Sequence, residues 1–284
     1  MGIVQGLTEF LPVSSSGHLS FMKHILKINT NTGLLFDVLL HLGTLIAIFI
    51  AFWSDIKQLI AETIAILGDV LHNTLVLCHT SKREPKSQYR KIVSSSYRRF
   101  VVLILISTIP TALLGLLLES VIETKITTVF IPGLCLILTG VLLVMADRYK
   151  VGTKTEETTT YGDAFFLGIS QGLATIPGLS RSGTTITAAL SRGFHQSYAV
   201  RYSFLMSIPA VLGAVVLEVK DIANETITKV DICNYFVGMV VAAVIGFYCI
   251  KTMLVLIHGK KFTYFAVYCF LIGIIAVVSN FLMM

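Results

Sequence analysis

Charged side chains are scarce in this sequence. They make up 13% of its 284 residues, whereas soluble domains carry about 25%. A soluble protein of this length could not cover its surface with so few charges. Short segments of alternating polarity are also lacking, which argues against a membrane β-barrel. The chain instead has long apolar stretches, so the sequence predicts an all-α integral membrane protein.

Cysteine is scarce too, and a cleavable leader is not recognisable. The five cysteines are odd in number and no two have the spacing of metal ligands, so we expect neither a disulfide framework nor a zinc site. The first ten residues have no basic start and no cleavage pattern, which argues against a signal peptide. We therefore expect the chain to insert into the membrane through its own spans.

Six apolar stretches are long enough to cross a bilayer, which takes about 20 helical residues. They are residues 34–53, 100–118, 129–145, 203–217, 232–257 and 263–281. Residues 58–76 are also apolar but include Glu62, Asp69 and His72. We expect this segment to be an amphipathic helix at the interface, with a seventh span as the alternative. The chain is then a single membrane domain, residues 1–284.

The net charge of +6 comes mostly from one loop, residues 79–99, which holds seven basic residues against the single acid Glu84. The positive-inside rule places this loop in the cytoplasm. The same rule places residues 119–128 and 220–231 outside, and residues 148–150 and 258–261 inside. Because the basic excess serves membrane orientation, we expect no nucleic-acid partner.

The strongest organisational feature is an internal repeat. Residues 2–18 align without a gap over residues 168–184, with eight of 17 positions identical, where chance gives about one. At the same offset, residues 36–47 align over residues 202–213. We therefore expect two repeats, which cover about 1–146 and about 163–284.

Two segments, residues 1–31 and 163–201, fit no full span. Each has a short apolar run, a cluster of Pro, Gly and Ser, and a second short run. This pattern predicts a re-entrant helical hairpin, whose tip is tolerated only where protein or a water-filled cavity surrounds it. If residues 58–76 lie at the surface, three spans separate the copies, and an odd number inverts the second copy. Such an inverted repeat places a site near the bilayer midplane, where the hairpins meet.

Three ionisable residues lie in these hairpins: Glu9 and His18 in the first, and Arg181 in the second. Because charge inside a membrane is costly, such residues point to function. Hydroxyl groups surround them, from Ser14, Ser15, Ser16, Ser180, Ser182, Thr184 and Thr185. We expect a helix to begin after each tip, and helix N-termini and arginine both bind phosphate oxygens. The pattern therefore predicts a site for an anion with several oxygens.

The two copies differ in which chemistry they keep. In the sequence alignment of the two copies, Glu9 is aligned with Thr175, Ser15 with Arg181, and His18 with Thr184. One hairpin thus keeps the acid/base and nucleophile types and the other keeps the cation, a division that suits hydrolysis of a phosphoanhydride. The competing interpretations are packing by small residues and a structural Glu9–Arg181 pair. Asp37 and His41 share a helix face; with Arg201, they either line the cavity or pair with each other.

The motifs QGLTEFLPVSSSGH and PGLSRSGTT resemble those of the undecaprenyl-diphosphate phosphatase family, also known for bacitracin resistance. The segments FDVLLHLGT and SFLMSIPA are similar to family segments as well, and the likeness covers essentially the whole chain. The resemblance implies release of phosphate from undecaprenyl diphosphate, a lipid partner in the bacterial plasma membrane. It also implies a divalent cation, Mg²⁺ or Ca²⁺, and a site that opens to the outer face.

The resemblance also assigns roles to residues. It implies catalytic roles for Glu9, Ser15, His18 and Arg181, with Glu9 also a metal ligand. Substrate contacts fall to Gln5, Ser14, Ser16, Gly178, Ser180, Ser182 and Thr184. We favour Ser15 as the nucleophile with His18 as its proton carrier, while His18 as the nucleophile and direct hydrolysis both stay open. The rival function is a transporter that flips the polyprenyl phosphate, since inverted repeats with broken helices are also a transporter plan.

The chain departs from the family pattern in two places. Gln5 stands where many members have a glutamate, which concentrates the acid/base and metal roles on Glu9. Only ten residues precede Leu11, fewer than is usual, so we expect a short first helix. Either Met1 is an internal methionine of a longer chain, or that helix is truncated. A homodimer is one arrangement that the sequence leaves open.

Overall fold

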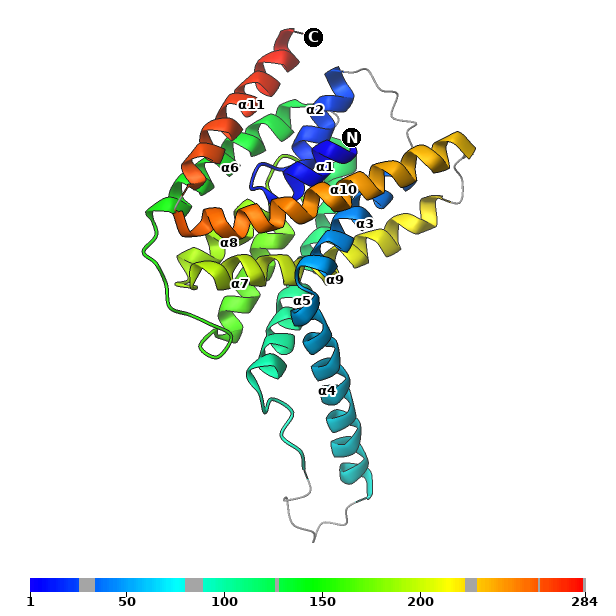
Figure 1. Ribbon diagram of the computed structural model, residues 1–284, viewed down its shortest axis with the longest axis vertical. Coiled ribbons are helices and arrows are strands. Elements are labelled where there is room, and N and C mark those ends of the chain that lie inside the picture. The colour runs from blue at the N-terminus through cyan, green and yellow to red at the C-terminus, as the bar shows by residue number, and fades with distance from the viewer. Residues whose placement is uncertain (26–33, 80–88, 126–127, 223–228, 260, 283–284) are drawn as a thin grey trace.

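The computed structural model describes residues 1–25, 34–79, 89–125, 128–222, 229–259 and 261–282. Its helices are α1 (Gly2–Phe10), α2 (Ser15–Ile25), α3 (Leu34–Ala51), α4 (Trp53–His79), α5 (Ser96–Lys125), α6 (Phe130–Arg148), α7 (Tyr161–Leu173), α8 (Arg181–Ser191), α9 (Gln196–Ile222), α10 (Lys229–Leu256) and α11 (Phe262–Leu282). Within the described ranges the only strand-like pairing is an isolated bridge between Lys154 and Phe194. The predicted all-α architecture is confirmed (Figure 1).

Six of the described helices are long and apolar enough to cross a membrane: α4, α5, α6, α9, α10 and α11. Five of them contain stretches that we predicted as spans. The sixth, α4, contains residues 58–76, for which a span was only the alternative, and α3 is apolar but shorter. Length and composition therefore favour α4 over α3 as a candidate span. Figure 1 shows α4 pointing away from the body of the other helices, and only 6% of its most apolar window is buried.

The projecting helix α4 has two different faces. Its acids pair with the basic segment that leads into α5, through Arg98–Glu62 at 2.9 Å and Arg98–Asp69 at 2.6 Å. Its other face exposes large apolar side chains, including Ile64 and Leu71. The amphipathic pattern predicted for this segment is thus present, while its position relative to the bilayer stays a prediction.

Two glycines in α1 and their repeat equivalents in α7 pack in the same way on different helices. A Cβ atom on Gly2 would lie 2.5 Å from a carbonyl oxygen of α10, and one on Gly168 would lie 2.1 Å from a carbonyl oxygen of α5. A Cβ atom on Gly6 would lie 2.9 Å from a carbonyl oxygen of α10, and one on Gly172 would lie 3.2 Å from a carbonyl oxygen of α5. Only glycine lets the two backbones come this close. The close packing holds the first helix of each hairpin against a long helix. The matched packing supports the predicted inverted repeat, which stays a prediction.

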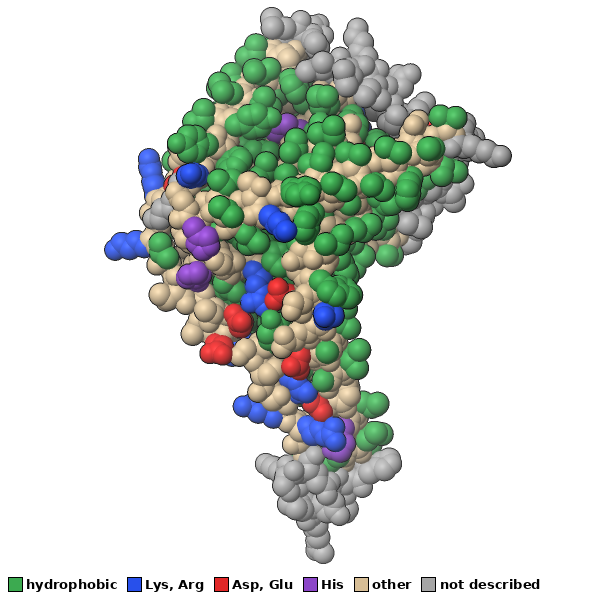
Figure 2. Space-filling view, viewed as in Figure 1, with side chains coloured by type: hydrophobic (Ala, Val, Ile, Leu, Met, Phe, Trp, Pro, Cys, Tyr) green, Lys and Arg blue, Asp and Glu red, His purple; other side chains and the backbone are tan. Residues whose placement is uncertain are grey.

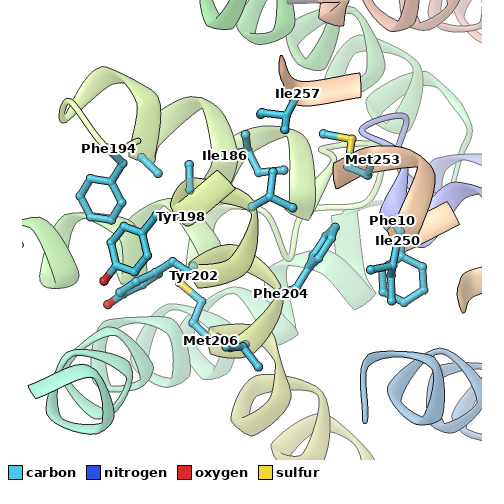
Figure 3. Close-up of a cluster of buried hydrophobic side chains, with 14 of the residues drawn as sticks. Phe10, Ile186, Phe194, Tyr198, Tyr202, Phe204, Met206, Ile250, Met253 and Ile257 are labelled. Carbon is cyan, nitrogen blue, oxygen red and sulfur yellow. The ribbon is translucent and has the colours of Figure 1, made fainter. Parts of the chain in front are cut away.

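A buried apolar cluster ties the hairpins to the long helices. Figure 3 shows Phe10, from the end of α1, and Ile186, from α8, on either side of Phe204 from α9. The Phe10 and Phe204 rings meet edge to face, with centroids 5.5 Å apart. Because Phe10 is fully buried, the residue next to Glu9 is held in the core.

Charged side chains gather at one end of the body and along the arm formed by α4, while apolar side chains cover the remainder of the visible face (Figure 2). Of the predicted cytoplasmic loop, residues 80–88 lie outside the described residues. The same holds for parts of the other expected loops and of the first hairpin: residues 26–33, 126–127, 223–228 and 260. All five cysteines are described and free; Cys249 and Cys269 are buried, whereas Cys78 and Cys233 are exposed.

Candidate active site

The tips of the two hairpins lie against one another. The backbone N–H of Gly178 donates to Ser16 Oγ at 3.3 Å, and a Cβ atom on Gly17 would lie 3.0 Å from the Gly178 Cα. Gly178 has a φ of +92°, and a Cβ atom there would lie 2.1 Å from the Pro132 carbonyl oxygen. The second tip therefore requires glycine at this position, both for its backbone conformation and for its contact with α6.

Glu9 is the centre of the polar contacts between the hairpins. Arg181 Nη2 donates to Glu9 Oε1 at 2.6 Å, across 172 positions of sequence. Ser15 Oγ donates to Glu9 Oε2 at 2.6 Å, and Gln5 Nε2 donates to the same oxygen at 3.1 Å. Glu9 is only 8% exposed, so these donors stabilise a buried carboxylate that would otherwise be costly.

The helices that follow the tips begin at equivalent residues of the repeat. Helix α2 begins at Ser15 and α8 begins at Arg181, so a helix does follow each tip, as predicted. Ser180 Oγ caps α8 by accepting from the Gly183 N–H at 3.1 Å, and Ser14 Oγ accepts from the Gly17 N–H at 3.3 Å. The remaining first-turn N–H groups of both helices are the kind of donors that bind phosphate oxygens.

Among the described hydrogen bonds His18 has none with Ser15, and its expected role as proton carrier stays a prediction. Its Nδ1 lies 2.7 Å from the Ser14 carbonyl oxygen, which can only accept, so Nδ1 carries the proton. Its Nε2 then accepts from the Tyr268 hydroxyl at 2.8 Å, and the two rings stack with centroids 5.5 Å apart. Because both imidazole nitrogens are engaged, the acceptor for the Ser15 hydroxyl in this structure is Glu9.

Tyr268 is a contact that the sequence interpretation missed. It lies in α11, 250 positions from His18, inside a stretch that gave only a hydropathy signal. The next residue, Cys269, is buried, and its Sγ approaches the Pro12 carbonyl oxygen at 3.7 Å. Helix α11 therefore contacts the first hairpin on both sides of its tip.

Several predicted site residues keep polar atoms that are buried and have no partner among the described residues. They include Gln5 Oε1, Arg181 Nη1 and Thr184 Oγ1. The remaining hydroxyls bond to each other or to the other tip: Ser14 with Ser16 at 3.4 Å, Ser180 with Ser182 at 3.3 Å, and Ser182 with the Leu11 carbonyl at 3.4 Å. Unpartnered buried polar atoms are rare, and a polar ligand would satisfy them.

The oxygen donors available for a divalent cation are few. The described residues contain no group of three or more His, Cys, Asp or Glu arranged to hold a metal ion. Glu9 provides one carboxylate, and Gln5 Oε1 is a buried amide oxygen without a partner. This pair fits a hard cation that takes its other ligands from substrate phosphates and water, as Mg²⁺ usually does.

A second buried carboxylate, Asp163, anchors the base of the second hairpin. With Thr160 it forms a capping box at the start of α7, and it accepts from Lys154 Nζ at 2.7 Å and Arg192 Nε at 2.7 Å. Burial alone would raise the pKa of Asp163. The hydrogen bonds from Lys154, Thr160 and Arg192 together outweigh that effect and hold the pKa below its usual value.

Asp37, His41 and Arg201 do not pair with one another. Asp37 accepts from Lys23 at 2.8 Å, and His41 Nδ1 lies 3.3 Å from Gln5 Nε2. Arg201 pairs instead with an acid of α4 and has no contact with the tips. Of the three residues, only His41 reaches the polar network around Glu9.

Comparison with known proteins identifies the family. The family model described as "Bacitracin resistance protein BacA" matches residues 1–275. A protein of Methanosphaera stadtmanae named undecaprenyl-diphosphatase is 39% identical over 280 residues, which cover 99% of this chain and 96% of that protein. Proteins of the same name from Alkaliphilus metalliredigens and Carboxydothermus hydrogenoformans are 36% and 37% identical, over 99% and 96% of this chain and 97% and 93% of their own. The chain therefore belongs to the bacitracin resistance protein BacA family.

Proposed function

We propose that this protein hydrolyses undecaprenyl diphosphate to undecaprenyl phosphate and inorganic phosphate within the membrane. The relatives named undecaprenyl-diphosphatase match it over nearly its full length. The observation that carries the proposal is the Ser15 hydroxyl bonded to Glu9, with Arg181 on the other oxygen of that carboxylate. A nucleophile, a proton acceptor and a phosphate-binding cation then stand together between two helix N-termini.

The diphosphate enters between the hairpin tips while the prenyl tail stays in the apolar surroundings. Arg181 Nη1, which has no partner among the described residues, binds a phosphate oxygen. The backbone amides at the starts of α2 and α8 supply further donors. Ser180, Ser182 and Thr184 from the second tip, and Ser14 and Ser16 from the first, complete the contacts, and Gly178 lets the backbone approach.

In the first step Ser15 Oγ attacks the terminal phosphorus. The new Oγ–P bond forms as the bond from that phosphorus to the bridging oxygen breaks, and undecaprenyl phosphate leaves with the bond's electrons. The proton of Ser15 passes to Glu9, to which it is already hydrogen-bonded at 2.6 Å. Arg181 stabilises the charge on the transferred phosphoryl group, and loss of such a contact costs about 100–1,000-fold in rate.

In the second step a water oxygen bonds to the phosphorus as the P–Oγ bond breaks, inorganic phosphate leaves, and Ser15 Oγ takes back its proton from Glu9. His18 carries the proton of this water once Tyr268 releases its Nε2, since that nitrogen is the imidazole's only acceptor. Direct attack by a water activated by Glu9 is the alternative to the covalent route. Rapid acid quench with substrate labelled in its terminal phosphate separates the two, because only the covalent route labels the protein.

A divalent cation, Mg²⁺ or Ca²⁺, would be held by Glu9 and Gln5 Oε1 together with substrate oxygens. When bound, it neutralises negative charge on the diphosphate. The product is the lipid carrier of cell-wall synthesis, so hydrolysis returns the carrier to use and confers bacitracin resistance. We place the protein in the plasma membrane with its site open to the outer face. A homodimer also stays a prediction, which the mass of the purified protein in detergent tests.

The test is phosphate release from undecaprenyl diphosphate by the purified protein in detergent, with and without Mg²⁺ or Ca²⁺. We expect cation-dependent release by the wild type and a loss of about 100-fold or more in Arg181→Ala. Arg148→Ala is the control, because it removes an exposed arginine at the end of α6, away from the hairpin tips. Absence of release by a folded wild type, or equal activity of both variants, would contradict the proposal.

A further inference from the structure

The Gln5 side chain links Glu9 to a histidine on another helix. Gln5 is fully buried, and its Nε2 lies 3.1 Å from Glu9 Oε2 and 3.3 Å from His41 Nδ1. Its Oε1 has no partner among the described residues. An amide nitrogen has two hydrogens, so both can be used in these two contacts.

The chemistry of these groups fixes the hydrogen-bond directions. A carboxylate only accepts, so the amide nitrogen of Gln5, and not its oxygen, must face Glu9. The same nitrogen then donates its second hydrogen to His41 Nδ1, which must be the unprotonated nitrogen of the neutral ring. The opposite amide orientation would bring Gln5 Oε1 against the carboxylate. The network therefore assigns the proton of neutral His41 to Nε2.

The other groups near His41 do not compete for Nδ1. Asp37 lies one turn earlier on α3 but accepts from Lys23. Thr44 donates to the backbone carbonyl of His41, and not to its ring. Glu218, from α9, and Glu9 itself interact electrostatically with His41. Among the described hydrogen bonds of the ring, the one to Gln5 is the one that leads to the site.

We propose that His41 is a positioning residue for phosphoryl transfer, which acts through Gln5 on Glu9. By accepting one amide hydrogen it keeps the other on Glu9 Oε2 and leaves Gln5 Oε1 available to the site. The inference rests on the proposed phosphatase function, but the hydrogen-bond directions do not. His41 has no described contact with Arg181 or with the serines of the tips, so its loss lowers kcat and leaves KM for the lipid diphosphate unchanged.

The first test is a double-mutant cycle between His41 and Gln5, read as kcat and KM for phosphate release. His41→Leu should lower kcat about tenfold with KM within about twofold, the scale at which supporting groups act on a site. His41→Asn should stay within about threefold of wild type, because the Asn Oδ1 offers an acceptor near the place of Nδ1. In a Gln5→Ala background, His41→Leu should have no further effect.

Three outcomes would overturn the inference: a multiplicative loss in the double variant, an equal loss in His41→Leu and His41→Asn, or an effect confined to KM. Thermal unfolding in detergent checks that each variant is folded.

A second measurement needs no activity and so stands apart from the proposed function. In ¹⁵N NMR of histidine-labelled protein at about pH 8, the signal lost in His41→Asn should be that of a ring protonated at Nε2. Protonation at Nδ1 would refute the inference even in an active enzyme.

Discussion

The first and second hairpins share a backbone plan but are held in place by different means. In the second, α7 begins with a side-chain capping box, and Asp163 is fixed by two cations. In the first, α1 has no side-chain cap, and it is held by glycine contacts with α10 and by buried Phe10. Each tip then presents a different residue at the start of its second helix, Ser15 or Arg181.

This difference suggests how a duplicated element is divided between two tasks. The second hairpin is anchored by charge at its base and offers a cation at its tip, so it can bind an anion without moving. In the proposed mechanism the first hairpin supplies the proton acceptor and the nucleophile, and in the structure its Glu9 pairs with Arg181 from the opposite tip. Neither hairpin alone contains the full set of groups that phosphoryl transfer requires.

The largest loss of activity is expected when the second tip can no longer approach α6. We expect Gly178→Ala to lower phosphate release about 100-fold, because a 1 Å displacement of a catalytic group can cost that much. Its φ of +92° and the 2.1 Å approach to the Pro132 oxygen leave no room for a Cβ atom. Gly193→Ala is the control, since Gly193 has a φ of +79° but nothing within 4 Å of the added atom. Similar losses in both variants would show that backbone strain, and not the tip contact, decides activity.

The anchoring of the second hairpin can be weakened without touching its tip. We expect Asp163→Asn to cost about 3–5 kcal/mol of stability, as for a buried ion pair that loses one partner. Because the pKa of Asp163 is lowered in the folded protein, the stabilisation is present above the usual pKa of 3.8 and is lost as the pH falls through the folded-state pKa.

Thermal unfolding of the wild type and Asp163→Asn across pH tests this anchoring. The gap between their unfolding temperatures should be widest near neutral pH and should narrow below pH 3.8. A gap that widens as the pH falls would reverse the assigned sign.

The smallest expected effect comes from Tyr268, whose hydroxyl and ring contact His18 of the first hairpin. Tyr268→Phe keeps the stacked ring but removes the hydroxyl that donates to His18 Nε2. We expect a loss of about threefold to tenfold in kcat, since one neutral hydrogen bond is worth about 1 kcal/mol. Tyr264→Phe, an exposed tyrosine on the same helix, serves as the control. An unchanged rate in Tyr268→Phe would show that the His18 orientation does not need this bond.

The sequence was sufficient to predict the helix positions of the residues that the internal repeat aligns. Because the two copies share one register, a helix was predicted to begin after each tip, and α2 and α8 begin at the equivalent residues Ser15 and Arg181. The partners of His18 were not predicted, because its ring bonds to the Ser14 carbonyl and to a tyrosine from a distant helix. Sequence spacing does not report such tertiary partners.

Two other features differed in how far the sequence could reveal them. The anchor at Asp163 has a signal in the sequence, since Thr160 and Asp163 have the spacing of a capping box. The sequence could not decide whether α4 is a candidate membrane span. Its acids argued against a span, but in the structure they are paired with Arg98 and Arg90. Those pairings depend on the fold and not on local pattern.

The central claim is that Ser15 and Glu9 act as one unit, with Glu9 as the acceptor of the serine proton. The most direct test is the rate of phosphate release by Ser15→Ala, Glu9→Gln and the double variant, with His18→Asn combined with Ser15→Ala for comparison. If the claim holds, the Ser15–Glu9 double variant loses no more activity than the worse single variant, because groups that act as a unit are non-additive. The claim would be contradicted if the activity losses of Ser15→Ala and Glu9→Gln multiplied in their double variant, while adding His18→Asn to Ser15→Ala caused no further loss. His18, and not Glu9, would then be the acceptor of the serine proton.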